Sequence, residues 1–248
     1  ALVAVVLLAT AGVAGFRLAR AGESMTAAAT AWLAGLEEVQ RARAQADFEA
    51  AARTDWHFVP KPVRKGLSFA EMTAAQREQA HALLKAAVSE AGYGKAMAIM
   101  ELDELLRRLE GTAAKNTRDS LRYFVTIFGV PGPEGSWGLS VEGHHLSLNF
   151  TVRDGVLVDS TPQFMGANPA EVKTTFPGQP AAGSRVLGAE ESLAFELVTS
   201  LDAEQRKRAV IAADAPAEIR AAGAAQPPAG PPEGIPFSKL SADQQSLV

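Results

Sequence analysis

The sequence predicts an α+β fold in which helices come first, an antiparallel β-meander follows, and further helices close the chain. Three observations carry this prediction. Residues 73–110 repeat apolar side chains at helical spacing, residues 121–158 are rich in β-branched and aromatic residues, and residues 189–213 return to helical spacing. Because helices and strands are segregated rather than alternating, an α/β fold with a parallel sheet is excluded.

Before the strands, the pattern predicts three helices. The first spans residues 24–53 and ends where two prolines, between residues 55 and 62, force extended backbone. The second spans 73–91, with Gly92 as its C-terminal cap, and the third spans 95–110. The apolar stripe of the first helix consists of Trp32, Leu33, Leu36, Val39 and Phe48.

In the middle of the chain the pattern predicts a strand over 121–128, a Pro/Gly turn over 129–136, and one long strand over 137–152. Asp154-Gly155 is a hairpin signal before a short strand at 156–158. Alternation along the long strand gives an apolar face, at positions 144, 146, 148 and 150, and a polar face, at 145, 147, 149 and 151. We expect Leu146, Leu148 and Phe150 to pack against the flanking helices.

After a Pro/Gly-rich loop over 161–183, helices are predicted at 189–199 and 202–213. Capping boxes mark three helix starts, because Thr, Asp or Ser at an N-cap with Gln three residues later bonds the free backbone N–H groups. These pairs are Thr73/Gln76, Asp202/Gln205 and Ser241/Gln244.

The two ends of the chain suggest a piece of a longer, exported protein. Residues 1–21 fit the apolar region of a secretory signal peptide or, if it is not cleaved, a membrane anchor. The predicted organisation continues with an α+β domain over 22–220, a Pro/Ala/Gly-rich linker over 221–236, and the start of a truncated C-terminal part over 237–248. We therefore expect a periplasmic or extracellular protein that touches a membrane only through its N-terminal segment.

Composition excludes some classes of function. Hydrophobic residues make up 47% of the chain, enough to bury a core, and the net charge of −4 is opposite to that of a nucleic-acid-binding protein. The absence of cysteine excludes disulfides, thiolate metal sites and thiol nucleophiles.

The chemistry-bearing candidates centre on His144 and His145. Neighbours on a strand point to opposite faces, so at most one of the two is expected in a given pocket. His144 shares its face with Glu142, and His145 lies beside Asn149, so either ring could ligate a divalent metal together with groups from elsewhere. The alternative is a core histidine bonded to a backbone carbonyl.

Other candidate residues surround this motif. Asp55 and His57 lie on one side of an extended segment and could form a carboxylate–histidine pair that orients an imidazole, or the segment could simply dock Trp56 and Phe58 into the core. His81 is expected on the exposed side of its helix. The charged residues Arg64, Lys65, Arg118, Asp119 and Arg122 are expected to be a solvated face rather than an anion-binding patch.

A set of short motifs over residues 50–248 resembles one known family, the domain of unknown function 3500. The motifs are Trp56-His57-Phe58-Val59-Pro60 with Arg64-Lys65-Gly66-Leu67, Glu71-Met72-Thr73 with Gln76-Arg77, Ser89-Glu90-Ala91-Gly92-Tyr93, Arg118-Asp119 with Tyr123, Phe128-Gly129 with Pro131, Trp137-Gly138, Gly143-His144-His145-Leu146-Ser147-Leu148-Asn149-Phe150, and Pro162-Gln163-Phe164-Met165-Gly166-Ala167-Asn168-Pro169. The resemblance implies a C-terminal continuation with a second histidine cluster that would complete a site around Gly143-His144-His145. It implies no reaction.

Two functional hypotheses follow. The first is an exported protein that holds a divalent metal at Gly143-His144-His145, with enzymatic activity left open. The second is a non-catalytic exported module in which Trp137, the Phe164 loop and charged residues bind a sugar or a peptide, while the histidines stabilise the sheet.

Overall fold

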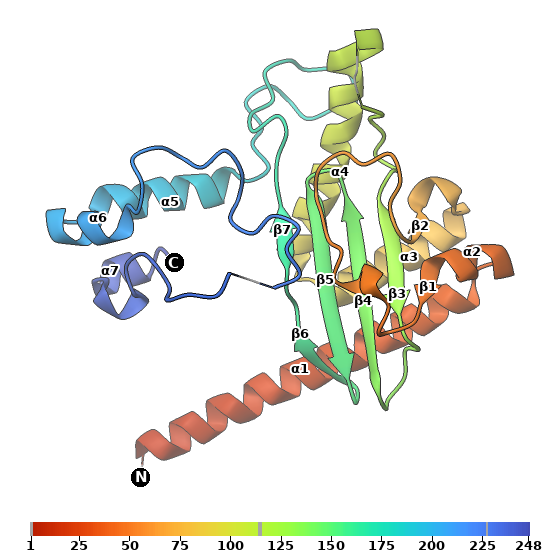
Figure 1. The fold of residues 1–248 in the computed structure, drawn as a ribbon, viewed down its shortest axis with the longest axis horizontal. Coiled ribbons are helices and arrows are strands. Elements are labelled where there is room, and N and C mark those ends of the chain that lie inside the picture. Colours follow the sequence, from red (N-terminus) through yellow and green to blue (C-terminus); the bar gives the residue numbers. More distant parts are fainter. Residues whose placement is uncertain (1, 114–115, 227) are drawn as a thin grey trace.

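The computed structural model describes residues 2–113, 116–226 and 228–248, and it confirms the α+β class (Figure 1). The helices of the described chain are α1 (Leu2–Ala34), α2 (Glu38–Ala44), α3 (Ala74–Ala87), α4 (Glu90–Glu110), α5 (Gly188–Ser200), α6 (Ala203–Ala209) and α7 (Ala242–Gln245). The strands are β1 (Gln45–Ala46), β2 (Leu67–Ser68), β3 (Phe124–Phe128), β4 (Ser136–Gly143), β5 (Leu146–Arg153), β6 (Val156–Asp159) and β7 (Gln163–Met165).

One mixed sheet forms the centre of the molecule, with strand order β1-β3-β4-β5-β6; β2 also pairs with β3, and β7 with β5. The predicted antiparallel meander is confirmed for β3 to β6, and its register places Thr126 opposite Ser140 and Ser140 opposite Asn149. β1 runs parallel to β3, at an edge that the sequence analysis did not predict.

The prediction of one strand over 137–152 is wrong. β4 ends at Gly143, β5 begins at Leu146, and His144 and His145 form the two-residue turn of a hairpin. His145 has a φ of +59°, a left-handed conformation that histidine adopts more readily than most residues. The two histidines therefore do not alternate across a strand, and the argument that they face opposite sides of the sheet does not apply.

Helix boundaries bring further corrections. The predicted helix over 24–53 ends at Ala34, α2 follows as a separate helix, Phe48 lies in a loop, and Val39 is exposed. Gly92 does not cap α3: its N–H donates to the Ser89 side chain in the first turn of α4, which begins at Glu90 rather than 95. α6 ends at Ala209, earlier than predicted. All three predicted capping boxes are present.

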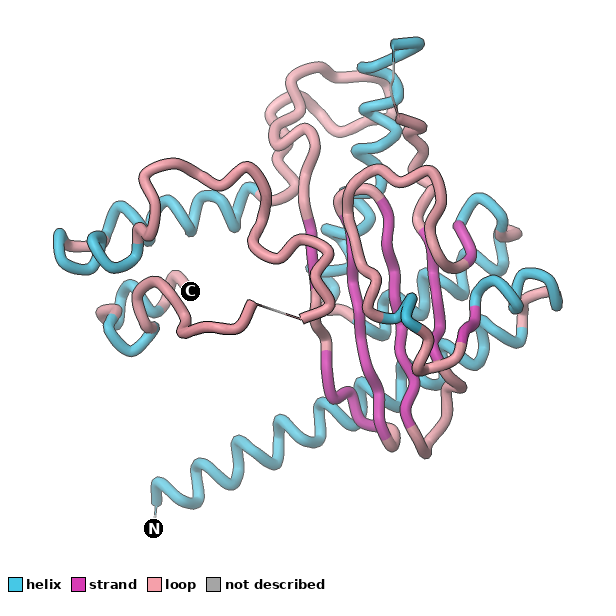
Figure 2. Tube along the Cα trace, viewed as in Figure 1, coloured by secondary structure: helices cyan, strands magenta, loops and turns pink. Residues whose placement is uncertain are grey.

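The apolar face of the sheet packs against α1, α3 and α4, which lie behind it in Figure 1. Leu146, Leu148 and Phe150 belong to this core, as predicted. The opposite face carries polar side chains and is crossed by two loop segments, residues 47–66 and 219–226, drawn in front of the strands in Figure 2. Both cavities described below lie on this polar face or at its edge.

Three helices lie outside the core of the domain. α5, α6 and α7 stand to one side of the sheet (Figure 1). α5 has no buried residue and exposes Leu193, Phe195 and Val198. At the other end, residue 1 lies outside the described residues, and the predicted signal or anchor segment from residue 2 onward forms the first part of α1. Within the described residues, no helix combines the length and the apolar character that a membrane crossing requires.

Candidate functional site

The histidine turn is positioned by a close approach between β4 and the start of β3. A Cβ atom on Gly143 would lie 2.2 Å from the Tyr123 ring and would clash with it. Only glycine therefore leaves room for this fully buried ring. The Tyr123 hydroxyl reaches the backbone oxygen of His144 at 2.9 Å and Oδ2 of Asp103, on α4, at 3.1 Å. Burial, and then the Asp103 carboxylate, raise the pKa of Tyr123 well above its usual value, so the phenol keeps its proton and donates it.

His144 is held by the same carboxylate. Its Nδ1 lies 2.7 Å from Oδ1 of Asp103, and both groups are nearly buried. A carboxylate accepts only, so Nδ1 carries the proton and the lone pair of a neutral His144 ring is on Nε2. Asp103 thus fixes both the tautomer and the orientation of the imidazole.

Arg118 closes the other side of this ring. Its Nη1 lies 3.3 Å from both ring nitrogens of His144, while Nε and Nη2 bind the two carboxylate oxygens of Glu110 at 3.0 and 2.8 Å. The paired hydrogen bonds raise the pKa of Arg118 and lower that of Glu110, so both stay charged. The expectation of a solvated charged face is wrong here, since the Arg118 side chain is 8% exposed.

Glu142 is the centre of a second buried charge group. Arg64 approaches its Oε1 at 3.3 Å and Lys65 its Oε2 at 2.7 Å, and the side chains of Arg64 and Glu142 are 2% and 3% exposed. Arg64 also donates to the backbone oxygens of His57 and Val59. Burial lowers the pKa of Arg64, and the Glu142 carboxylate opposes this shift. Both oxygens of Glu142 are therefore engaged with cations.

A cavity of about 220 Å³ opens between these two groups. Its charged lining consists of Lys61, Arg64, Arg122 and Asp103, and His144 completes the wall. Asp103 already bonds His144 and Tyr123, while Lys61 pairs with Asp55 and Arg64 with Glu142. Arg122 is therefore the cation of this wall that has no carboxylate partner among the described residues. The guanidinium of Arg122 donates to the backbone oxygens of Lys61 and Pro62, which leaves it charged at the cavity wall.

His145 has a different environment from His144. Its N–H donates to Phe58 and its C=O accepts from Gly166, so the turn is clamped between two loops. Burial, and then the electrostatic influence of His144 and Arg118, lower its pKa to about 4. The ring is therefore neutral at pH 7. Its Nδ1 is buried with no hydrogen-bond partner among the described residues, and its centroid is 4.2 Å from that of His144.

The remaining predicted site residues are not brought to this turn. Asp55 is exposed and pairs with Lys61 at 3.6 Å, while Nδ1 of His57 accepts from the N–H groups of Phe58 and Val59. Trp137 is fully buried on the apolar face, where its indole donates to Thr26 of α1. Asn149 lies on the polar face, in the wall of a larger cavity.

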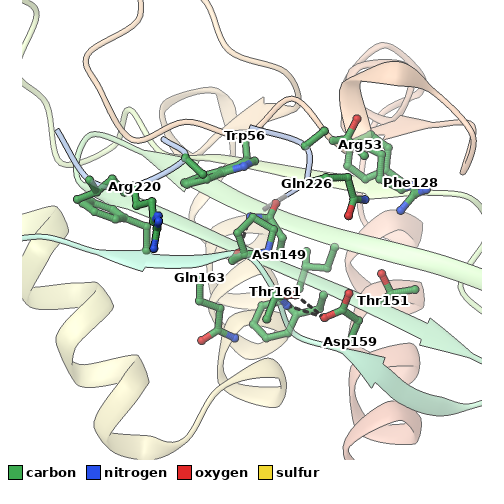
Figure 3. Close-up of a pocket in the computed structure, with 18 residues that line it drawn as sticks. Arg53, Trp56, Phe128, Asn149, Thr151, Asp159, Thr161, Gln163, Arg220 and Gln226 are labelled. Atoms are coloured by element: carbon green, nitrogen blue, oxygen red, sulfur yellow. Dashed lines mark hydrogen bonds between the residues drawn. The ribbon is translucent and has the colours of Figure 1, made fainter. Parts of the chain in front are cut away.

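This larger cavity has a volume of about 600 Å³ and is shown in Figure 3. One wall is the sheet around Asn149 and Thr151, and another is the segment 219–226, which the sequence suggested was the end of the domain and the start of a linker. The indole N–H of Trp56, on the loop 47–66, donates to the backbone oxygen of Ala224 at 2.7 Å and ties that loop to the segment 219–226. Phe164 also lines this cavity and stacks on Phe58 at 3.7 Å.

The family described as "Protein of unknown function (DUF3500)" matches residues 19–248, nearly the whole chain. The chain belongs to the DUF3500 family. This confirms the resemblance that the motifs indicated and extends it toward the N-terminus. Neither the curated proteins nor the solved structures gave a match.

Asp103 is the residue of this candidate site that the sequence analysis missed. It lies on the buried face of α4, four residues after Ile99 and three before Leu106. A carboxylate at a core position of an amphipathic helix is the signal that could have found it, because a buried carboxylate needs a partner. The sequence does not predict which partner Asp103 takes, since His144 is 41 residues away.

Proposed function

We propose that the cavity beside His144 binds a small anionic ligand with a carboxylate or phosphate group, and that His144 exchanges a proton with it. The observation that carries this proposal is the combination of the Asp103-bound imidazole with Lys61, Arg64 and Arg122 in one wall. Cations that are already partly desolvated attract an anion more strongly than surface cations do. The volume of about 220 Å³ limits the ligand to a small molecule.

The chemistry that this arrangement supports is general acid–base catalysis. With Nδ1–H bonded to Asp103, Nε2 of His144 can take a proton from a bound ligand, and the carboxylate stabilises the imidazolium that forms. Whether a reaction completes this cycle depends on the ligand.

The test is a titration of the protein with inorganic phosphate, acetate and succinate, followed through the imidazole nitrogen signals of His144 by NMR. We expect one of these anions to shift the Nε2 signal, and Arg122→Gln to weaken that binding by about tenfold. Lys207→Gln is the matched control, because it removes one positive charge from exposed α6. Absence of any shift, or an equal effect of both substitutions, would overturn the proposal.

A divalent metal at the turn is the second candidate, and the neutral ring of His145 with its unbonded Nδ1 favours it. Neutral imidazole is the form that binds metals. The described residues hold no group of three or more His, Asp or Glu side chains arranged for a metal ion, and both Glu142 oxygens face cations. Metal content, measured in protein purified without a His tag, should fall with His145→Asn; equal content in both proteins would end this candidate.

We also propose that the protein is exported, on the strength of the apolar run over residues 1–16. Fractionation of cells that express it from its natural gene should place it in the periplasm or the medium, or in the membrane if the segment stays attached. Recovery in the cytoplasm alone would contradict export.

A further inference from the structure

We propose that the larger cavity on the polar face of the sheet is a second binding site, and that its ligand is a neutral, hydroxyl-rich molecule of the carbohydrate class. This inference rests on residues other than those of the histidine turn. The two sites can therefore be tested, and can fail, separately.

The first supporting observation is an unbonded polar atom in the cavity wall. Asn149 is 8% exposed, and its Nδ2 donates to Oγ of Ser147 at 3.2 Å and to the backbone oxygen of Pro162 at 2.9 Å. Both amide hydrogens are thus used, which fixes the orientation of the side chain. Its Oδ1 is buried and has no hydrogen-bond partner in the part of the chain that the structure describes. A buried acceptor without a donor is costly, so a ligand O–H that reaches Oδ1, once the atoms that cover it move aside, gains a strong contact.

The second observation is the mixed character of the lining. Trp56 lies above Asn149 in Figure 3, with Asp159, Thr151 and Thr161 on the other side. Because the indole N–H of Trp56 is committed to Ala224, what Trp56 offers a ligand is its apolar ring. Sugars present C–H groups on one side and hydroxyls around their rim, which suits an aromatic wall opposite amide, hydroxyl and carboxylate groups.

The third observation is the charge balance, which separates this cavity from the one beside His144. Of its two arginines, Arg220 forms an ion pair with Glu233 at 2.5 Å, and Arg53 lies over the Phe48 ring and donates to the Phe48 backbone oxygen. Asp159 offsets the remaining positive charge, and its Oδ1 already accepts from Thr161. With the charges paired, a neutral ligand fits better than an anion.

Size supports the same class. The volume of about 600 Å³ falls within the range of about 300–1,000 Å³ typical of small-molecule sites, and it is well above that of the cavity beside His144. An oligosaccharide of a few units has both the length and the hydrogen-bonding groups to reach from Asn149 to Gln163 and Gln226, which line the same cavity with exposed side chains.

The experiment is a screen of the whole chain against an array of immobilised neutral and charged oligosaccharides, followed by calorimetry with any that are retained. We expect at least one neutral oligosaccharide to bind and to change the tryptophan fluorescence, because Trp56 borders the cavity while Trp32 and Trp137 are fully buried elsewhere. Asn149→Leu should weaken this binding by about tenfold or more, since it removes the acceptor.

Two further variants make the test independent of folding. Gln163→Ala changes an exposed residue of the cavity wall and should weaken binding severalfold without affecting stability. Glu196→Ala, on exposed α5, is the control and should change neither the binding nor the stability. Retention of no neutral oligosaccharide would overturn the proposal. So would binding that Asn149→Leu and Gln163→Ala both leave unchanged, or retention of charged oligosaccharides alone.

Discussion

The central sheet buries both of its faces, but it does so in two different ways. Along β5, Leu148 and its neighbour Asn149 are 0% and 8% exposed, although one is apolar and the other polar. On the apolar face, side chains such as Leu148 pack against helices. On the polar face, Thr126, Ser140, Glu142, Ser147 and Asn149 are buried beneath loops.

The difference between the faces lies in what each needs in order to be buried. Apolar side chains need only contact, which any well-packed helix provides. Polar side chains need specific partners, because a buried polar group without one is costly. On the polar face those partners come from distant loops, as Arg64 and Lys65 do for Glu142. Some buried atoms, such as the Ser140 hydroxyl, find no partner within residues 2–113, 116–226 and 228–248. The apolar face therefore stabilises the fold by packing against the helices, while both candidate sites lie on the polar face or at its edge.

The largest effect should follow from Glu142→Gln on the polar face. The substitution keeps the shape but leaves Arg64 and Lys65 without their counter-charge, and breaking a buried ion pair from one side typically costs about 3–5 kcal/mol. Urea unfolding of the variant and the wild type measures the loss. The double variant Glu142→Gln/Arg64→Met should lose less than the sum of the two single variants. A loss below about 1 kcal/mol for Glu142→Gln would mean that this charge group is not needed for burial.

On the apolar face, Leu148→Ala should cost about 2–5 kcal/mol, because it removes apolar contact and leaves a cavity in the core between the sheet and the helices. Val158→Ala, on half-exposed β6, is the control and should change the free energy of unfolding by about 0.5 kcal/mol or less. The comparison would fail if Leu148→Ala cost no more than this control.

A pH-dependent effect should follow from the burial of His145 in the turn. The pKa of His145 is about 4 in the folded protein against an ordinary value of 6.5, so the unfolded chain takes up a proton first as the pH falls. The contribution of this ring to stability is therefore complete above about pH 6.5 and falls between pH 6.5 and 4. His144 and Arg118 add to the lowering by burial, while Asp103 and Glu218 oppose it.

His145→Asn removes this proton uptake and keeps the left-handed turn, which asparagine tolerates. Urea unfolding at several pH values should show a shallower loss of stability between pH 6.5 and 4 for the variant than for the wild type. Equal slopes would show that His145 titrates normally and is not buried as described. His81, whose pKa burial also lowers, is present in both proteins and cancels in the difference.

The same contrast explains how much the sequence could predict. Period-two alternation and capping boxes are local signals, and they predicted the apolar face and the three capped helix starts. The turn at His144 was missed because strand-like residues continue on both sides of it, and nothing local shows that Tyr123 must pass Gly143. The partners of His144 were not predictable either, because Asp103 and Arg118 lie 41 and 26 residues away.

The smallest and most diagnostic effect concerns Thr126. Its hydroxyl is buried beside Gly66, whose φ is +89°, and has no hydrogen-bond partner among the residues described. Thr126→Val replaces this hydroxyl with a methyl group of similar size and keeps a β-branched residue in β3. Since no bond is lost, stability should stay the same or rise by about 1 kcal/mol, as measured by urea unfolding.

Thr161→Val is the matched control, because the Thr161 hydroxyl donates to Asp159 at 2.7 Å and its removal should cost about 0.5–1.5 kcal/mol. A loss of more than 1 kcal/mol for Thr126→Val would contradict the expectation and would mean that the hydroxyl binds buried water. Thr126, Ser140 and Asn149 lie opposite one another across β3, β4 and β5, and each has an oxygen with no hydrogen-bond partner in the described parts of the chain. Such a loss would therefore indicate a hydrated row across the polar face that leads to the cavity wall at Asn149, and a ligand there would have to displace water to reach Oδ1.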